Sequence, residues 1–132
     1  ARETVAAVEA LGRRARAYPA GVDHRDDAQQ LAQAVLRDFG AVHILVNNAG
    51  ISSRGQKVAD TDPGEPERVM AVHVMGPFHL AQFLLPQMRR LGRCDIVMVS
   101  SVATRKFSAG GAPCAWRRDC RNARSGGSEA EF

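Results

Sequence analysis

Two polar clusters follow compact apolar runs in this 132-residue chain. Asn47–Gly50 comes directly after Val42–Val46, and Ser100 and Ser101 come directly after Asp95–Val99. A continuous β-branched run bounded by turn residues is typical of a strand buried on both faces, as in a parallel sheet. Because ligands bind at the carboxyl ends of such strands, the two clusters predict a site at one edge of a sheet.

The residue types of the first cluster suit a ligand that lies against the main chain. Ala49 and Gly50 are small enough to let the backbone approach a bound molecule closely. The side-chain amide of Asn48 can hold the ends of neighbouring strands through hydrogen bonds. The cluster therefore predicts a loop that shapes the sheet edge and contacts a ligand.

Helices are predicted before and between these strands. Apolar residues at helical spacing predict three helices. They cover residues 2–13, a stretch that starts near Asp23 and runs to about Phe39, and residues 65–91, the last with a kink near Gly76-Pro77. Asp23 marks the start of the second helix, because a carboxylate is stabilised there by the free amide groups and the positive end of the helix dipole. Residues 14–20 read as a short strand. This alternation is the pattern of an α/β fold with crossover helices.

Four segments, in this order, resemble the short-chain dehydrogenase/reductase family. Asp23 with Asp26 resembles the acidic turn that contacts the adenine of the cofactor. Leu45–Gly50 resembles the family's Asn-Asn-Ala-Gly motif. Glu67–Phe78 is similar to its long interface helix, and Ile96–Ser101 is similar to its strand ending in the catalytic serine. The resemblance covers roughly residues 1–113.

The resemblance implies a fold, a cofactor and an activity. The fold is α/β, a partial Rossmann-like doubly wound parallel sheet with crossover helices. The activity is NAD(P)-dependent oxidoreduction of a small-molecule alcohol or carbonyl substrate, with the hydride supplied by NAD or NADP. Ser101 corresponds to the residue that polarises the carbonyl, and Asp23, Asn48, Ala49 and Gly50 correspond to the cofactor lining. An alternative role for Asp23 is that of a helix cap.

Departures from the family pattern predict an impaired enzyme. The helix position of the family's asparagine holds His73, which can also donate and accept. Cys114 and Arg118 fall where the tyrosine and lysine belong. A thiol is a poor hydrogen-bond donor and an arginine does not release its proton, so neither replaces its counterpart. The chain also starts after the glycine-rich turn that receives the pyrophosphate.

Two further readings compete with the enzyme. In the first, the chain is a non-catalytic truncated remnant or an interaction module. It would form a homo-oligomer through helix 65–91, whose apolar face includes Val69, Val72, Met75 and Phe83. In the second, the basic tail binds nucleic acid, a reading we weigh below the others because a basic tail is usually a solvated segment.

Composition limits the remaining classes of function. The length allows one small domain, assigned to residues 1–113, followed by a divergent, disordered tail over residues 114–132 that a frame shift near Pro113 would explain. Residues from Arg105 onward carry six of the basic and three of the acidic groups, leaving the rest nearly neutral although the formal net charge is +4. This predicts no basic face on the folded part and no nucleic-acid partner.

The cysteine and histidine patterns predict neither a metal site nor a disulfide framework. The three cysteines leave an odd count, and the histidines have no ligand partners at metal spacing. We expect a reduced, cytoplasmic setting. No signal peptide and no apolar run of the ~18 residues that a membrane span needs is recognised, so we expect no membrane partner.

Overall fold

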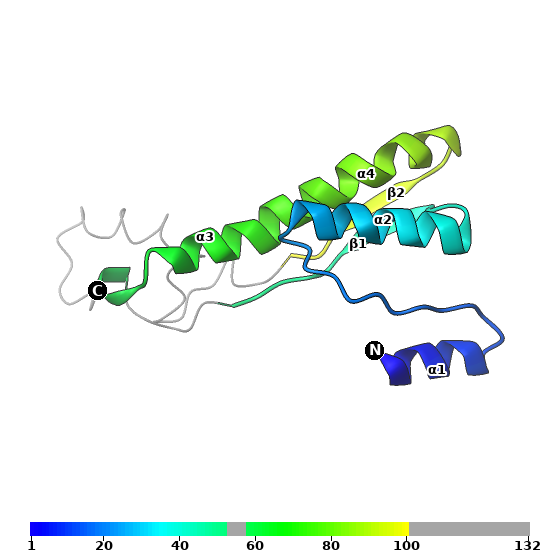
Figure 1. The fold of residues 1–132 in the computed structure, drawn as a ribbon, viewed down its shortest axis with the longest axis horizontal. Helices are drawn as coiled ribbons and strands as arrows, with labels where there is room; N and C mark the ends of the chain where they lie inside the picture. The colour runs from blue at the N-terminus through cyan, green and yellow to red at the C-terminus, as the bar shows by residue number, and fades with distance from the viewer. Residues whose placement is uncertain (53–57, 101–132) are drawn as a thin grey trace.

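The computed structural model describes residues 1–52 and 58–100, and Figure 1 shows how their helices and strands are arranged. Helix α1 (Arg2–Ala10) leads through an extended segment to α2 (Arg25–Phe39) and then to strand β1 (Ile44–Asn47). A 3-10 turn, η1 (Val58–Asp60), precedes α3 (Gly64–Met70), the π-helical turn η2 (Ala71–Met75), α4 (Gly76–Arg90) and strand β2 (Asp95–Met98).

The two strands pair in parallel, and α3, η2 and α4 connect them. Leu45 lies opposite Ile96, and the ladder extends past the strands because the Val99 N–H donates to the Asn47 carbonyl at 3.0 Å. Helices α2 and α4 run side by side along the pair (Figure 1). This is the predicted strand–helix–strand crossover, and it brings the carboxyl ends of both strands to one edge.

A small aliphatic core holds the helices to the strands. Ala32 of α2 packs with Leu84 and Met88 of α4, and all three are buried. The partly buried residues packed against this cluster are Leu36, Val42, Leu45, Phe83 and Cys94. The Gln87 side-chain oxygen also accepts a hydrogen bond from the Val42 N–H at 3.1 Å. Helix α4 is therefore fixed both to α2 and to the segment that leads from α2 into β1.

The long helix predicted over residues 65–91 is present, with an irregular turn next to Gly76-Pro77. Its hydropathy differs from what the sequence predicted. The helical geometry changes at η2, directly before Gly76. Gly64–Arg90 is nevertheless one 27-residue helix, and an 18-residue stretch of it, with a mean hydropathy of 1.3, is apolar enough, by length and composition alone, to cross a membrane. The expectation that no segment has this character was wrong. Core helices of soluble proteins have it too, and α4 buries Leu84 and Met88.

Two expectations about strands are also wrong. The strands are not buried on both faces: Ile44 and Val46 are 59% and 54% exposed, and Val97 is 43% exposed. The reason is that each strand has one hydrogen-bonded neighbour in the described chain and that α2 and α4 cover one face. Residues 14–20 are described without strand structure, because they pair with neither β1 nor β2.

Asp38, near the end of α2, holds this segment in place instead. The Tyr18 hydroxyl donates to the Asp38 carboxylate at 2.8 Å, and Arg16 lies 3.6 Å from it. Arg14 donates to the Asp38 carbonyl, and Arg37 lies 3.4 Å from the carboxylate. The hydrogen bond from Tyr18 and the two neighbouring guanidinium groups lower the pKa of Asp38, against the effect of desolvation. Desolvation first, and then Asp38, raise the pKa of Tyr18.

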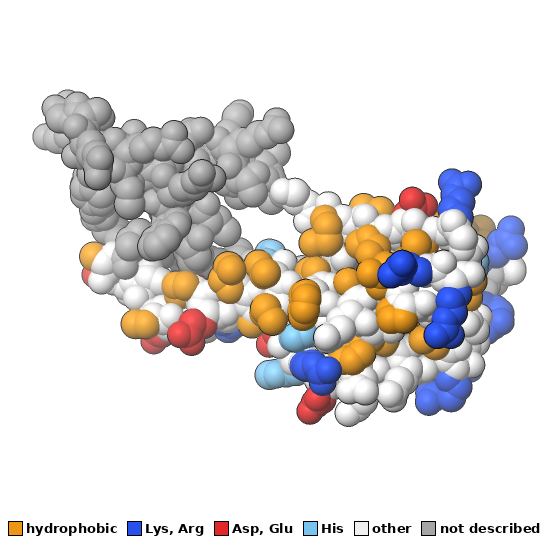
Figure 2. All heavy atoms as spheres, turned by 90° about the horizontal axis from the view of Figure 1, so that it is seen from above, with side chains coloured by type: hydrophobic (Ala, Val, Ile, Leu, Met, Phe, Trp, Pro, Cys, Tyr) orange, Lys and Arg blue, Asp and Glu red, His pale blue; other side chains and the backbone are white. Residues whose placement is uncertain are grey.

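Basic side chains gather at one end of the described structure, as Figure 2 shows. Arg37 lies in the last turn of α2, and Arg89 and Arg90 lie in the last turn of α4. Both helices end where a parallel strand begins, and cations are favoured at the negative ends of helix dipoles. The near-neutral balance of the sequence therefore conceals an uneven distribution of charge along the described structure.

The Tyr18–Asp38 hydrogen bond makes stability depend on pH. A carboxyl group whose pKa is lower in the folded chain contributes stability above its unfolded pKa, about 3.9, and loses it as the pH falls through the folded pKa. Urea unfolding followed by circular dichroism between pH 7 and pH 3 should show a steeper loss of unfolding free energy below about pH 4 in the wild type than in Tyr18→Phe. Parallel curves for the two chains would contradict this account.

Candidate functional site

The end of β1 is fixed by Asn47. Its side chain is 9% exposed, and its Nδ2 donates to Sδ of Met98 at 3.3 Å. Its carbonyl accepts from the Val99 N–H. Asn47 therefore joins the two strand ends, the role that we expected of Asn48. The two-residue period of a strand could have identified it, because Asn47 faces the same side as Leu45, which packs on the core.

The next three residues form an exposed loop. Asn48, Ala49 and Gly50 are all exposed at the carboxyl end of β1, where the sequence predicted a ligand-contacting loop. The position of this loop depends on a side chain from the long helix. Nε2 of His73 lies 3.1 Å from the Ile51 N and 2.8 Å from the Ile51 carbonyl oxygen. His73 is thus bound to the loop rather than packed against other helix residues.

Gly50 allows this close approach. A Cβ atom at residue 50 would lie 2.9 Å from Cε1 of His73, closer than real Cβ contacts. The imidazole ring therefore occupies the space that any larger residue at this position would need. Glycine is required here by the neighbouring ring rather than by the backbone dihedral angles.

The π-helical turn explains the direction of His73. His73 is the middle residue of η2 (Ala71–Met75), where the Gly76 N–H donates to the Ala71 carbonyl, five residues back. Pro77 has no N–H, so the His73 carbonyl lacks the donor that an α-helix would supply from that position. Single π-turns within α-helices are often found at functional sites. His73 is the only titratable residue of η2.

The turn before α2 meets the same helix one turn further along. A Cβ atom at Gly76 would lie 3.2 Å from both Cγ2 and the carbonyl oxygen of Val22. The turn itself is closed by the Gly21 N–H, which donates to the Asp27 carboxylate at 3.0 Å. Asp23 follows directly and lies half-buried, 3.7 Å from the His24 imidazole. The N-cap of α2 is His24, so the cap role considered for Asp23 is wrong.

The two predicted cofactor segments therefore share one support. The loop around Gly50 lies on His73, and the turn that holds Asp23 lies on Gly76, three residues later. Residues three apart on a helix lie on neighbouring turns of one face. The helical stretch His73–Gly76 thus brings together an acidic turn and a small-residue loop that are separate in the sequence. Sequence reasoning missed Val22, which meets Gly76 with its side chain and its carbonyl, and Ile51, which meets His73 with its backbone.

The other predicted site residues have a different status. Ser101, Cys114 and Arg118 lie outside the described residues, and β2 ends at Met98, before the first of them. Over residues 1–52 and 58–100, no three His, Cys, Asp or Glu side chains gather in a way that could hold a metal ion.

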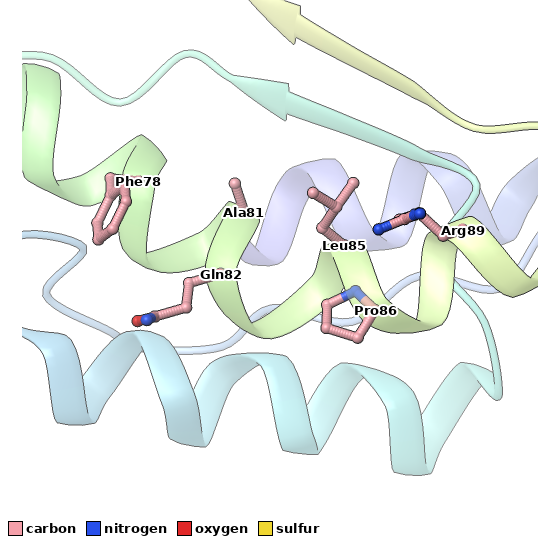
Figure 3. Close-up of a pocket in the computed structure, with 6 residues that line it drawn as sticks. All are labelled: Phe78, Ala81, Gln82, Leu85, Pro86 and Arg89. Atoms are coloured by element: carbon pink, nitrogen blue, oxygen red, sulfur yellow. The ribbon is translucent and has the colours of Figure 1, made fainter.

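The outer face of α4 carries a separate apolar feature. Among the described residues, those that line a groove of about 420 Å³ all belong to α4, and Figure 3 shows their side chains along one side of the helix. These residues are Phe78, Ala81, Gln82, Leu85, Pro86 and Arg89. Phe78 is 56% exposed and Leu85 is 37% exposed. The apolar face predicted for this helix is therefore divided, since Val69 and Val72 are buried while Met75 is 42% exposed.

A comparison with known families agrees with this arrangement. The model of the short chain dehydrogenase family matches residues 1–114, which include the loop, the acidic turn and the helix that supports both. The chain belongs to the short chain dehydrogenase family. The resemblance drawn from the four sequence segments is thereby confirmed.

Individual members of the family are similar in sequence to parts of this chain. An uncharacterized oxidoreductase of Thermotoga maritima is 39% identical over 102 residues, which are 77% of this chain and 39% of that protein. The dehydrogenase/reductase SDR family member 7B of Bos taurus is 44% identical over 71 residues, 54% of this chain and 22% of that protein. The chain thus spans well under half the length of these curated relatives.

Solved structures of the family confirm the predicted fold class. A metagenomic short-chain oxidoreductase in complex with NADP matches with a TM-score of 0.78 at 28% identity, over 92% of this chain and 55% of that one. An NAD+-bound xylitol dehydrogenase gives the same TM-score and identity over 92% of this chain and 47% of that one. This chain therefore has a partial Rossmann-like α/β fold.

The contact between Gly50 and His73 can be tested by a double-mutant cycle. Gly50→Ala is expected to displace the imidazole and lower the free energy of unfolding, whereas the same change in a His73→Ala background meets no ring. Urea unfolding of the four chains should give a coupling of about 1 kcal/mol. Effects that add to within about 0.3 kcal/mol would mean that the two residues do not touch.

Proposed function

We propose that the chain is the cofactor-binding part of an NAD(P)-dependent oxidoreductase acting on an alcohol or carbonyl. The observation that carries this proposal is the shared support at His73–Gly76, which holds an acidic turn and an exposed small-residue loop at the carboxyl end of a parallel strand. Ligands bind at such edges of α/β sheets. Related structures in complex with NADP and with NAD+ support the choice of ligand.

The residues present fit a dinucleotide. Asn48, Ala49 and Gly50 expose their backbone without large side chains that would prevent close approach. The half-buried carboxylate of Asp23 provides an acceptor for a hydrogen-bond donor of the ligand. When bound, the nicotinamide would supply or accept the hydride. The chain's own residues would bind and orient the cofactor.

We further propose that catalysis is impaired in the chain as it stands. Ser101 corresponds to the carbonyl-polarising serine, but Cys114 and Arg118 stand at the positions of the tyrosine and lysine. His73 holds the Ile51 backbone, so its imidazole does not substitute freely for a relay asparagine. The family match ends at residue 114, which supports a division into a cofactor domain over 1–113 and a divergent tail over 114–132.

Cofactor binding tests this proposal directly. We expect saturable binding of NADH or NADPH in a fluorescence titration and no turnover with an alcohol screen. Asp23→Asn should weaken binding about tenfold, since a hydrogen bond to a charged group is worth roughly 1.5 kcal/mol. Asp95→Asn, which changes an exposed carboxylate at the first residue of β2, at the edge of the sheet opposite the loop, is the matched control and should bind like the wild type.

Two outcomes would contradict the proposal. An absence of NADH and NADPH binding by a chain that is folded by circular dichroism would remove the cofactor role. Nicotinamide-dependent turnover by the purified chain would contradict the impairment alone. For the cellular setting, we propose a cytoplasmic location, supported by the odd number of cysteines, of which Cys94 is free.

A second candidate function is pairing of two copies through α4. It is favoured by the exposed side chains of Phe78 and Leu85, which line the apolar groove in Figure 3. Exposed contiguous apolar patches mark interaction surfaces. A homo-oligomer formed through this helix would cover them.

The oligomeric state of variants tests the pairing. Light scattering after size exclusion should find a dimer for the wild type and a monomer for Phe78→Glu, because a buried charge without a partner opposes association. Leu11→Glu, on the 80% exposed side chain that follows α1, should leave the dimer intact. A wild-type chain that is monomeric at about 50 μM, above the roughly micromolar dissociation constants of transient pairs, would exclude this candidate.

A further inference from the structure

One ring nitrogen of His73 faces two backbone groups of opposite character. Nε2 lies 3.1 Å from the Ile51 N, which donates, and 2.8 Å from the Ile51 carbonyl oxygen, which accepts. An imidazole nitrogen donates when it carries a proton and accepts when it does not. His73 can therefore satisfy the amide or the carbonyl of Ile51, but not both together.

The two groups belong to different peptide planes. The Ile51 N–H lies in the peptide that begins at Gly50, whereas the Ile51 carbonyl lies in the peptide that leads to Ser52. A protonated imidazole only donates, so it holds the second plane. A neutral imidazole with its proton on Nδ1 accepts from the amide, so it holds the plane that includes Gly50.

We propose that His73 is a proton-dependent positioning residue for the loop Asn48–Ile51. Loss of the Nε2 proton, which leaves the neutral ring protonated on Nδ1, transfers the hydrogen bond from the Ile51 carbonyl to the Ile51 amide and so fixes the Gly50 peptide. The consequence for the cofactor rests on the function proposed above: the loop binds NAD(P)H more tightly when His73 is neutral. Histidine is the side chain whose ordinary charge change falls between pH 5 and 8, so the experiments below cover most of that range.

Few charged groups surround His73 in the described structure. His73 is exposed, so solvent protons reach it. The residues three and four positions away on its own helix, Val69, Met70, Gly76 and Pro77, carry no charge, and neither does the loop Asn48–Ser52. The nearest titratable groups along the helix are Arg68 and His79. On the turn packed against Gly76 they are Asp23 and His24, which lie 3.7 Å from each other.

An asparagine at this position would behave differently. Its side chain presents one acceptor oxygen and one donor amide together and does not titrate. His73→Asn can therefore serve both groups of Ile51 at any pH. This makes it the conservative variant that separates proton dependence from a purely structural role.

Nuclear magnetic resonance of the 15N-labelled chain between pH 5.5 and 8.5 tests the proposal without a cofactor. The Ile51 amide is expected to shift with the same midpoint as the His73 ring nitrogens, and to show no such transition in His73→Asn. His43→Asn, which changes another exposed histidine, is the control and should leave the Ile51 transition unchanged. An Ile51 amide that stays constant while His73 titrates, or that titrates equally in His73→Asn, would overturn the proposal.

Fluorescence titration with NADH at pH 6 and pH 8 tests the consequence for binding. The wild type is expected to bind about threefold more tightly at pH 8, a modest difference because only one hydrogen bond changes, and His73→Asn equally at both. An equal ratio of affinities in the two chains would contradict the link between His73 and the cofactor. An Ile51 transition without any NADH binding would support the proton-dependent contact and contradict the proposed function instead.

Discussion

Close packing on the helical stretch His73–Gly76 is the constraint on which the described structure depends. At both ends of this stretch a loop approaches so closely that an added methyl group would force its neighbour to move, at 2.9 Å from His73 for Gly50 and at 3.2 Å from Val22 for Gly76. Protein interiors transmit such constraints because they are packed as densely as organic crystals. The helix that connects the two strands therefore also fixes the spacing between the acidic turn and the loop after β1.

Much of this arrangement could be predicted from local sequence patterns. The end of α2 at Gly40, the two parallel strands and the irregularity before Gly76 follow from periodicity and from the local preferences of glycine and proline. Motif order identified the family, because four weak signals in sequence agree more rarely than any one of them. Asn48, Ala49 and Gly50 were correctly placed in an exposed loop at a strand end.

The remaining features depend on contacts that local patterns do not encode. The expected burial of both strand faces failed because burial depends on which elements cover a strand, not on how apolar it is. The strand expected at residues 14–20 failed because a strand needs a hydrogen-bonded neighbour, whereas this segment binds Asp38. The contact of His73 with the loop could not be predicted, since nothing in its sequence neighbours shows that Ile51, 22 residues earlier, lies beside it.

The long connection between the two strands has a consequence for the order of folding. Paired positions such as Asn47 and Met98 are 51 residues apart, so the pair closes a large loop, and non-local pairing of this kind is slow. The 27-residue helix Gly64–Arg90 occupies about half of that loop and forms from local contacts on a much faster timescale. The helix is therefore expected to form first and to reduce the search, so that the sheet edge that carries the site is among the last parts of the chain to take shape.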